Sequence, residues 1–160
     1  MVKRIKSIIL ICTCIVLIVT TATCLSNSRK GDIFAFVIEH EVLLSNAALE
    51  MKNAEWDFEE QRWQNISVTD IESEILRSAL ELNGLCKITI VKTGVDFCFG
   101  GSRQFQSGFY YSNDGTPIFI LDGARVDFTQ HNDGWIYRFG GNSFFTERIV
   151  GNFFYYEMRW

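Results

Sequence analysis

From residue 85 to the C-terminus, the chain consists of short β-branched and aromatic runs separated by glycine-containing turns. These runs are separated by three Asp-Gly pairs and one Gly-Gly run: Asp114-Gly115, Asp122-Gly123, Asp133-Gly134 and Gly140-Gly141-Asn142. Asp-Gly between such runs is typical of β-hairpins, because glycine adopts the backbone conformation that tight hairpin turns require. The pattern predicts a twisted antiparallel β-meander of six to seven strands, at residues 86–91, 95–99, 108–112, 117–121, 124–129, 135–139 and 153–160.

Two cysteines fall in this predicted sheet. If Thr93-Gly94 forms a two-residue turn, Ile90 lies opposite Phe97, and Cys98 lies opposite Thr89. Cys86 and Cys98 then point to opposite faces, which favours two buried thiols. An export route still permits a disulfide between them, so both alternatives stay open.

The last predicted strand carries aromatic residues on both faces. Phe153 and Tyr155 alternate with Phe154, Tyr156, Met158 and Trp160. A strand that is apolar on both sides is central and covered, or it is half-covered with a binding face. The pattern favours burial.

Two helices are expected before the sheet. Asp32 is a good N-cap for a helix over residues 33–51, and a second helix runs from about Thr69 or Asp70 to Asn83, ended by Gly84. The first helix has two apolar arcs and a narrow polar strip, so we expect it to be buried on most sides. Its second arc consists of Ile38, Val42 and Leu49. We expect both helices to cover one face of the sheet, giving a single α+β domain over residues 29–160.

Residues 1–28 have the layout of an export segment. Lys3, Arg4 and Lys6 form a basic region, and the 18 residues from Ile8 to Leu25 carry no charge. Three interpretations remain: a cleaved signal peptide, an uncleaved anchor crossing the membrane through residues 5–25, or a lipoprotein modified at Cys24. Each places the rest of the chain outside the cytoplasm, either secreted or attached to a membrane.

The exported part is acidic. It has 12 Lys and Arg against 19 Asp and Glu, a net charge of −7, and the excess lies between Glu39 and Glu81. This balance opposes nucleic-acid binding and suits either a basic protein partner or a solvated helix face. The tryptophans and the phenylalanine of the acidic segment, Trp56, Phe58 and Trp63, are the candidate partner-binding residues.

No motif assigns catalytic, metal or cofactor residues. His40-Glu41 begins like a zinc-protease helix, but Leu44 stands where the second histidine belongs. The cysteines and histidines are too far apart in sequence for a structural zinc site. Gly100-Gly101-Ser102-Arg103 allows an anion-binding nest, although a turn or bulge is the more ordinary interpretation.

Several aromatic phrases resemble an uncharacterised family of short exported bacterial proteins. They are Val95-Asp-Phe-Cys-Phe-Gly-Gly, Gly108-Phe-Tyr-Tyr-Ser, Asp133-Gly-Trp, Thr146-Glu-Arg-Ile and Phe154-Tyr-Tyr-Glu. The resemblance covers most of the chain after Asp32. It implies a small α+β domain behind an export signal and brings no activity with it.

The sequence therefore favours an exported, cell-envelope-associated protein with a non-enzymatic binding role and no cofactor. One alternative is a small secreted hydrolase that uses His40 or His131 with acidic neighbours or Arg103. Its two-histidine form requires both histidines in one cleft. A second alternative is a carbohydrate-binding module, which requires Tyr110, Trp135 or Tyr155 to lie flat on the surface.

Overall fold

The computed structural model describes residues 29–53, 63–66, 73–82, 85, 87–102, 104–121 and 124–160. Trp56, Phe58, Cys24, Cys86 and Arg103 lie outside these residues. Contacts divide the chain into residues 1–33 and residues 34–160, and the second unit contains every described strand. Among the described residues, no helix has the length and hydropathy needed to cross a membrane.

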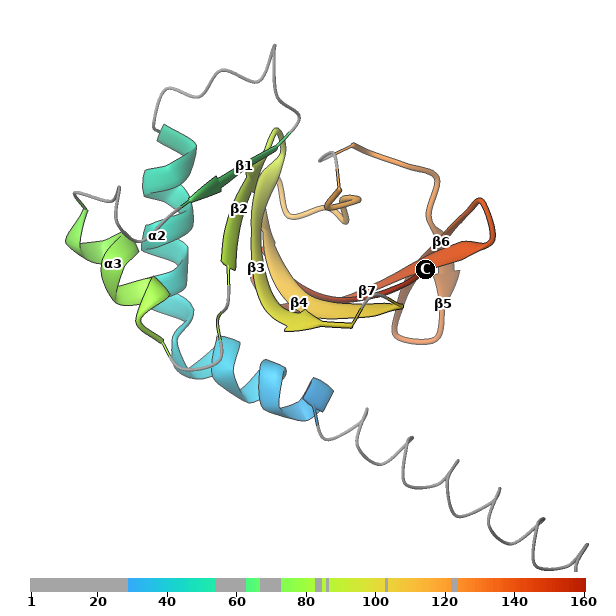
Figure 1. Ribbon diagram of the computed structural model, residues 1–160, viewed down its shortest axis with the longest axis horizontal. Coiled ribbons are helices and arrows are strands. Elements are labelled where there is room, and N and C mark those ends of the chain that lie inside the picture. The colour runs from blue at the N-terminus through green and yellow to red at the C-terminus, as the bar shows by residue number, and fades with distance from the viewer. Residues whose placement is uncertain are drawn as a thin grey trace, which may run out of the picture. The chain divides into compact units, whose positions relative to one another are not determined.

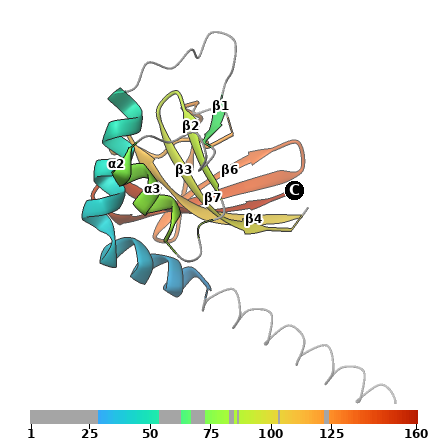
Figure 2. The same cartoon turned by 60° about the vertical axis from the view of Figure 1, so that its left-hand side comes forward.

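The helical part begins earlier than predicted. Residues 29–33 are already helical, so Asp32 is not the N-cap. Residues 34–39 are helical, and α2 spans Glu41–Asn53 after a turn at His40. Hydrogen bonds from His40 N to Phe36 O (3.1 Å) and from Leu44 N to His40 O (3.0 Å) flank this turn, at which the chain changes direction (Figures 1 and 2). The second predicted helix is α3, Glu74–Leu80.

In the part of the chain that the structure describes, eight strands form one antiparallel sheet in the order β1-β2-β3-β4-β8-β7-β6-β5. The predicted α+β class with an antiparallel sheet is confirmed. The sheet joins two meanders through the β4–β8 pair, rather than forming a single meander. The strands are β1 (Trp63–Ile66), β2 (Lys87–Val91), β3 (Gly94–Gly101), β4 (Phe105–Ser112), β5 (Thr129–His131), β6 (Gly134–Phe139), β7 (Asn142–Val150) and β8 (Phe153–Arg159).

The sheet is strongly curved, and the helices α2 and α3 lie on its convex side (Figures 1 and 2). Ring contacts tie the helical segment to this side: the centroid of Phe36 lies 5.1 Å from that of Phe99 and 6.1 Å from that of Phe109. From α2, the side chains of Leu44, Ala47, Ala48 and Met51 are buried. The convex side of the sheet is thus part of the helix–sheet core.

The concave side holds a second aromatic layer. Tyr110 stacks on Phe154 with centroids 5.3 Å apart, and Phe144 stacks on Tyr156 at 5.7 Å. The predicted burial of the last strand on both faces is confirmed for Phe153 to Tyr156 and for Met158, whereas Trp160 follows β8 and is exposed. Alternation along the strand sends successive rings into the two layers.

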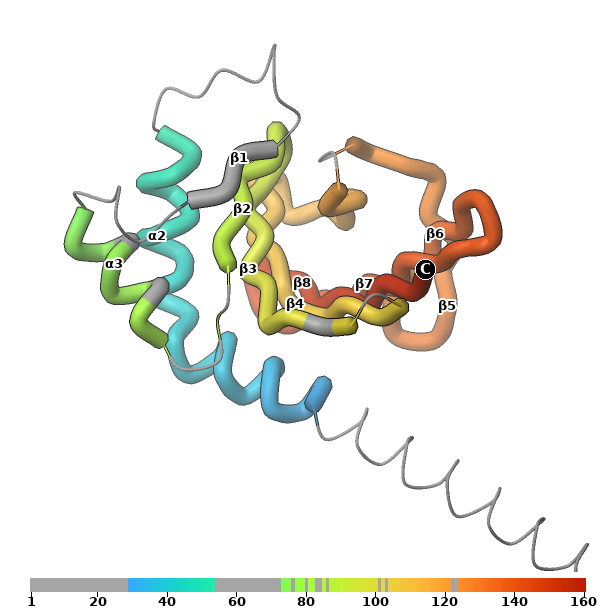
Figure 3. Tube along the Cα trace, in the orientation of Figure 1, coloured from blue at the N-terminus to red at the C-terminus, as the bar shows by residue number. Residues whose placement is uncertain are grey.

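Residues 113–121 and 124–128 cover the concave side instead of forming the predicted strands at 117–121 and 124–129 (Figure 3). Only an isolated bridge joins Phe119 to Ala124, and β5 begins at Thr129. Ile118, Phe119 and Ile120 are buried against the concave aromatic layer. The apolar residues of this segment fill the hollow of the sheet. Their sequence pattern therefore resembles that of a strand, although the segment does not pair as one.

A network around the Tyr110 hydroxyl holds this covering segment. The Ile118 N–H donates to the Tyr110 oxygen at 3.3 Å, and the Tyr110 and Thr146 hydroxyls are 2.8 Å apart. Since Thr146 Oγ1 donates to the Tyr155 carbonyl at 2.9 Å, it accepts from Tyr110. One buried hydroxyl therefore connects β4, β7 and the covering segment.

The hairpin turns differ in detail from the predictions. The first turn is Lys92–Thr93, so Ile88 pairs with Phe97 and Cys98 pairs with Lys87, not with Thr89. The turn before β6 is Asn132–Asp133, since His131 pairs with Gly134. Gly140–Gly141 forms the predicted turn, with φ of 52° and 86°. The strand β7 that follows it was not predicted.

We expect Tyr110→Phe to lower the free energy of unfolding by about 1–3 kcal/mol, because it leaves the Ile118 N–H and the Thr146 hydroxyl without their buried partner. Urea unfolding of the full chain measures this change. Tyr137→Phe is the matched control, since the half-buried Tyr137 ring packs on the same aromatic cluster. Equal losses in both variants would contradict the role assigned to the Tyr110 hydroxyl.

Candidate functional site

The residues predicted to bind a partner are only partly described. Trp56 and Phe58 lie outside the described residues, as does the lipidation candidate Cys24. Trp63 begins the edge strand β1, where its backbone pairs with Val91. These three aromatic residues stay a prediction, and a different surface of the helical segment is now apparent.

The second apolar arc of the helical segment is exposed, contrary to the expectation that this helix is buried on most sides. The exposed fractions are 57% for Ile38, 75% for Val42 and 42% for Leu49. We call these three residues the outer helix face. The first arc packs on the sheet, and the single layer of helices leaves the second arc uncovered. Val42 and Leu49 are seven residues apart on α2, so their side chains lie on one side of that helix, and Ile38 precedes them across the turn at His40.

The two histidines lie in different surroundings. The His40 ring contacts the Phe36 ring with centroids 4.9 Å apart at the turn before α2. His131 lines a cavity of about 260 Å³ together with Glu157 and Arg159 at the other half of the sheet, and His40 does not line that cavity. Glu157 accepts a hydrogen bond from the Tyr155 hydroxyl at 2.7 Å and pairs with Arg159 at 3.4 Å. The cleft with two histidines that the hydrolase alternative requires is not formed there.

The aromatic residues of the carbohydrate-binding alternative are not surface platforms. Tyr110 and Tyr155 are buried, and Trp135 is half-buried beside Phe154. Gly100 and Gly101 follow the bulge interpretation, because pairing of β3 with β4 shifts between Cys98 and Gly101 and Gly100 has a φ of 83°, while Arg103 lies outside the described residues. The Gly100 N–H points to Cys98 Sγ at 3.1 Å.

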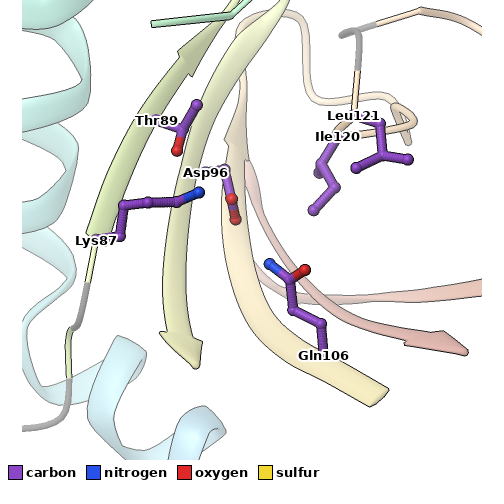
Figure 4. Close-up of a pocket in the computed structure, with 6 residues that line it drawn as sticks. All are labelled: Lys87, Thr89, Asp96, Gln106, Ile120 and Leu121. Carbon is purple, nitrogen blue, oxygen red and sulfur yellow. The ribbon is translucent and has the colours of Figure 1, made fainter. Parts of the chain in front are cut away.

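A cavity of about 210 Å³ opens on the concave side of the sheet. Its lining combines charged, polar and apolar side chains from β2, β3, β4 and the covering segment. Figure 4 shows them around one space, with the end of Lys87 directed toward Asp96. We call this the concave pocket, and its lining residues are Lys87, Thr89, Asp96, Gln106, Ile120 and Leu121.

Asp96 is the unusual residue of the concave pocket. It lies between Thr89 and Tyr110 in adjacent strands, and only 5% of its surface is exposed. Burial raises its pKa to about 7, against the lowering effects of a hydrogen bond from Tyr156 and the charge of Lys87. Its Oδ1 atom has no hydrogen-bond partner among the described residues. A buried acceptor without a donor is uncommon in folded proteins.

Gly108 explains how Tyr156 reaches Asp96 from two strands away. Gly108 pairs with Cys98 on one side and Tyr156 on the other. A Cβ atom on Gly108 would lie 2.9 Å from the Tyr156 ring and hydroxyl, so the ring crosses β4 where that strand has no side chain. The Gln106 amide nitrogen then donates to the Tyr156 hydroxyl (3.2 Å) and to Cys98 Sγ (3.3 Å).

Burial, with the nearby Asp96 and Cys98, also raises the pKa of Tyr156, so its hydroxyl keeps its proton and serves as a donor to Asp96. The concave pocket thus combines the Gln106 amide with the Asp96 carboxyl group, whose Oδ1 atom has no donor among the described residues. Such an arrangement can accept a hydrogen-bond donor or a cation.

Sequence reasoning missed the concave pocket. Its signal was Asp96 within the apolar run Val95-Asp-Phe-Cys-Phe, at a position that faces the same side as the aromatic Tyr110. A charged residue on a buried strand face indicates a special environment. The proximity of Asp96 to Gln106 and Tyr156 could be recognised only once the pairing register of β3, β4 and β8 was known.

Comparison of the chain with protein-family models, curated proteins and solved structures gives no match. The resemblance to exported bacterial proteins stays a prediction from the aromatic phrases alone.

The raised pKa of Asp96 predicts a stability that decreases with pH. Between pH 4 and 7 the unfolded chain loses this proton and the folded chain keeps it, so the free energy of unfolding falls as pH rises. We expect Asp96→Asn, which carries no charge, to exceed the wild type by a few kcal/mol at pH 8 and to differ little at pH 4.

Urea unfolding of both full-length proteins at the two pH values measures the difference between their free energies of unfolding. The other titrating groups contribute equally to both proteins, so they do not affect this difference. Asp127→Asn, an exposed position of the covering segment, is the control and should give the same small change at both pH values. A difference between wild type and Asp96→Asn that does not vary with pH would show that the carboxyl titrates normally.

Proposed function

We propose that this protein is an exported, cell-envelope-associated binding domain, and that its outer helix face docks an amphipathic helix of a basic partner protein. The observation that carries this proposal is the exposure of Val42 and Leu49 on one side of α2, together with the exposed Ile38 just before the turn at His40. Isolated exposed apolar residues are common, whereas an aligned set is typical of an interaction surface.

The spacing of the outer helix face suits a helical partner. Val42 and Leu49 are seven residues apart on α2, as in the seam of a helix pair. Ala35 and Ile38 are also exposed and precede the turn at His40. Burying a side chain the size of valine, leucine or isoleucine stabilises a complex by about 1.5–3 kcal/mol before the costs of association. Three such residues give a short seam enough energy for a specific, reversible contact.

Charge favours a basic partner. Glu39 is exposed next to Ile38, and the exported part of the chain carries a net charge of −7. Lys and Arg beside the apolar residues of a partner helix would therefore be attracted, while an acidic helix would be repelled. Trp56, Phe58 and Trp63, in the same acidic part of the sequence, extend this proposal as further candidate contacts.

A site-specific crosslink tests the proposal. A photoreactive amino acid replaces Asn46, an exposed residue between Val42 and Leu49 along the helix, and the full chain is irradiated in native cells. We expect one crosslinked protein whose attachment point is a helix with apolar and basic residues. Val42→Asp should reduce its yield at least tenfold, because the acid cannot be buried against apolar side chains.

Leu121→Asp is the matched control, since it places the same acid on an exposed apolar residue of the covering segment, away from the helices. Its crosslink yield should equal that of the wild type. Crosslinks only between two copies of this chain would show self-association and overturn the assignment of a basic partner. A crosslink yield unchanged by Val42→Asp would overturn the docking face itself.

A further inference from the structure

We infer that the concave pocket binds a small zwitterion, such as an apolar α-amino acid, with the ligand ammonium on Asp96 and the ligand carboxylate on Lys87. This inference does not depend on the outer helix face, because the pocket lies on the concave side of the sheet and α2 lies on the convex side (Figure 1).

The Oδ1 atom of Asp96 specifies the first end of the ligand. Asp96 lines the pocket, and its Oδ1 atom has no hydrogen-bond partner among the described residues, while Tyr156 already donates to the same carboxyl group. The missing interaction is therefore a hydrogen bond from a positively charged or neutral donor. An ammonium group supplies both the hydrogen bond and the opposite charge, and charge-assisted hydrogen bonds of this kind are about twice as strong as neutral ones.

Lys87 specifies the second end. It is exposed at the start of β2, and its ammonium is directed toward Asp96 from the pocket wall in Figure 4. A ligand that carried only positive charge would be repelled by Lys87. A ligand carboxylate removes that repulsion and forms an ion pair with Lys87 at the more exposed end of the pocket. The acidic Asp96 and the basic Lys87 therefore match the ammonium and the carboxylate of a zwitterion.

The volume and the remaining walls limit the body of the ligand. A cavity of about 210 Å³ equals the space of about seven waters in the liquid, below the range of pockets for drug-sized ligands. Ile120 and Leu121 form an apolar wall opposite the sheet in Figure 4. A compact aliphatic body fits this wall, whereas a nucleotide is too large for the cavity.

Leucine and two fragments of it are the probes. Leucine carries both charges, 3-methylbutylamine lacks the carboxylate, and 4-methylpentanoate lacks the ammonium. Binding to the full-length protein is followed by the carboxyl ¹³C shift of labelled aspartate. We expect the Asp96 signal to shift with leucine at millimolar concentration, with at least tenfold weaker binding of either fragment.

The variants separate the two charges. Asp96→Asn lacks the Asp96 signal, so its binding is followed by saturation-transfer NMR of leucine, as is that of the wild type for comparison. Asp96→Asn should weaken leucine binding at least tenfold, and Lys87→Gln should reduce it to the level of the amine. Lys92→Gln, an exposed lysine of the adjacent turn, is the matched control and should bind as the wild type does. A cooperative thermal unfolding transition of Asp96→Asn shows that the variant is folded, so a loss of binding is not a loss of structure.

The pH dependence gives an independent readout. The titratable groups that face Asp96 are Lys87, Cys98, Tyr110 and Tyr156, and Asp96 itself changes charge in the neutral range. Leucine should bind about tenfold more weakly at pH 6 than above pH 8, since an ionised Asp96 is required. Absence of a shift with all three probes would overturn the inference. Equal binding of leucine and 3-methylbutylamine would overturn the role of Lys87.

Discussion

The hydrogen bonds of the Tyr110 hydroxyl connect three parts of the fold that are far apart in the sequence, namely β4, β7 and the covering segment. The two meanders of the sheet meet at β4 and β8, and Tyr110 lies on β4 at this junction. Its link to Thr146 reaches β7, and its link from Ile118 fixes the covering segment. Because the hydroxyl is buried, each bond that it makes avoids an unsatisfied polar group. The closed concave side, and hence the concave pocket, depends on this network.

The absence of a side chain at Gly108 determines what the pocket contains. A Cβ atom there would collide with the Tyr156 ring, which would then turn away from Asp96 and Gln106. Glycine destabilises a strand, but at Gly108 of β4 the Tyr156 ring from β8 fills the space that a side chain would occupy. A packing feature of the sheet thus positions the phenol that donates to Asp96.

The sequence allowed the class of the fold to be predicted, because period-two alternation and glycine turns act within one hairpin. The Gly140–Gly141 turn and the burial of β8 on both faces followed from such local patterns. Residues 117–121 were misjudged, since apolar residues that plug a hollow resemble those of a strand. The pocket depends on pairing between β2, β3, β4 and β8, and no local pattern encodes the partners of Asp96.

Two features of this protein suit binding rather than folding, and they lie on opposite sides of the sheet. Val42 stays mostly exposed on α2, so it contributes little hydrophobic free energy to folding. Asp96 buries a carboxyl beneath Ile120 and Leu121, and this burial lowers the stability of the fold. A residue that lowers the stability of the isolated fold is typical of a functional surface, because binding can return the free energy that folding lost. An apolar partner would bury Val42, and a bound ammonium group would offset the cost at Asp96.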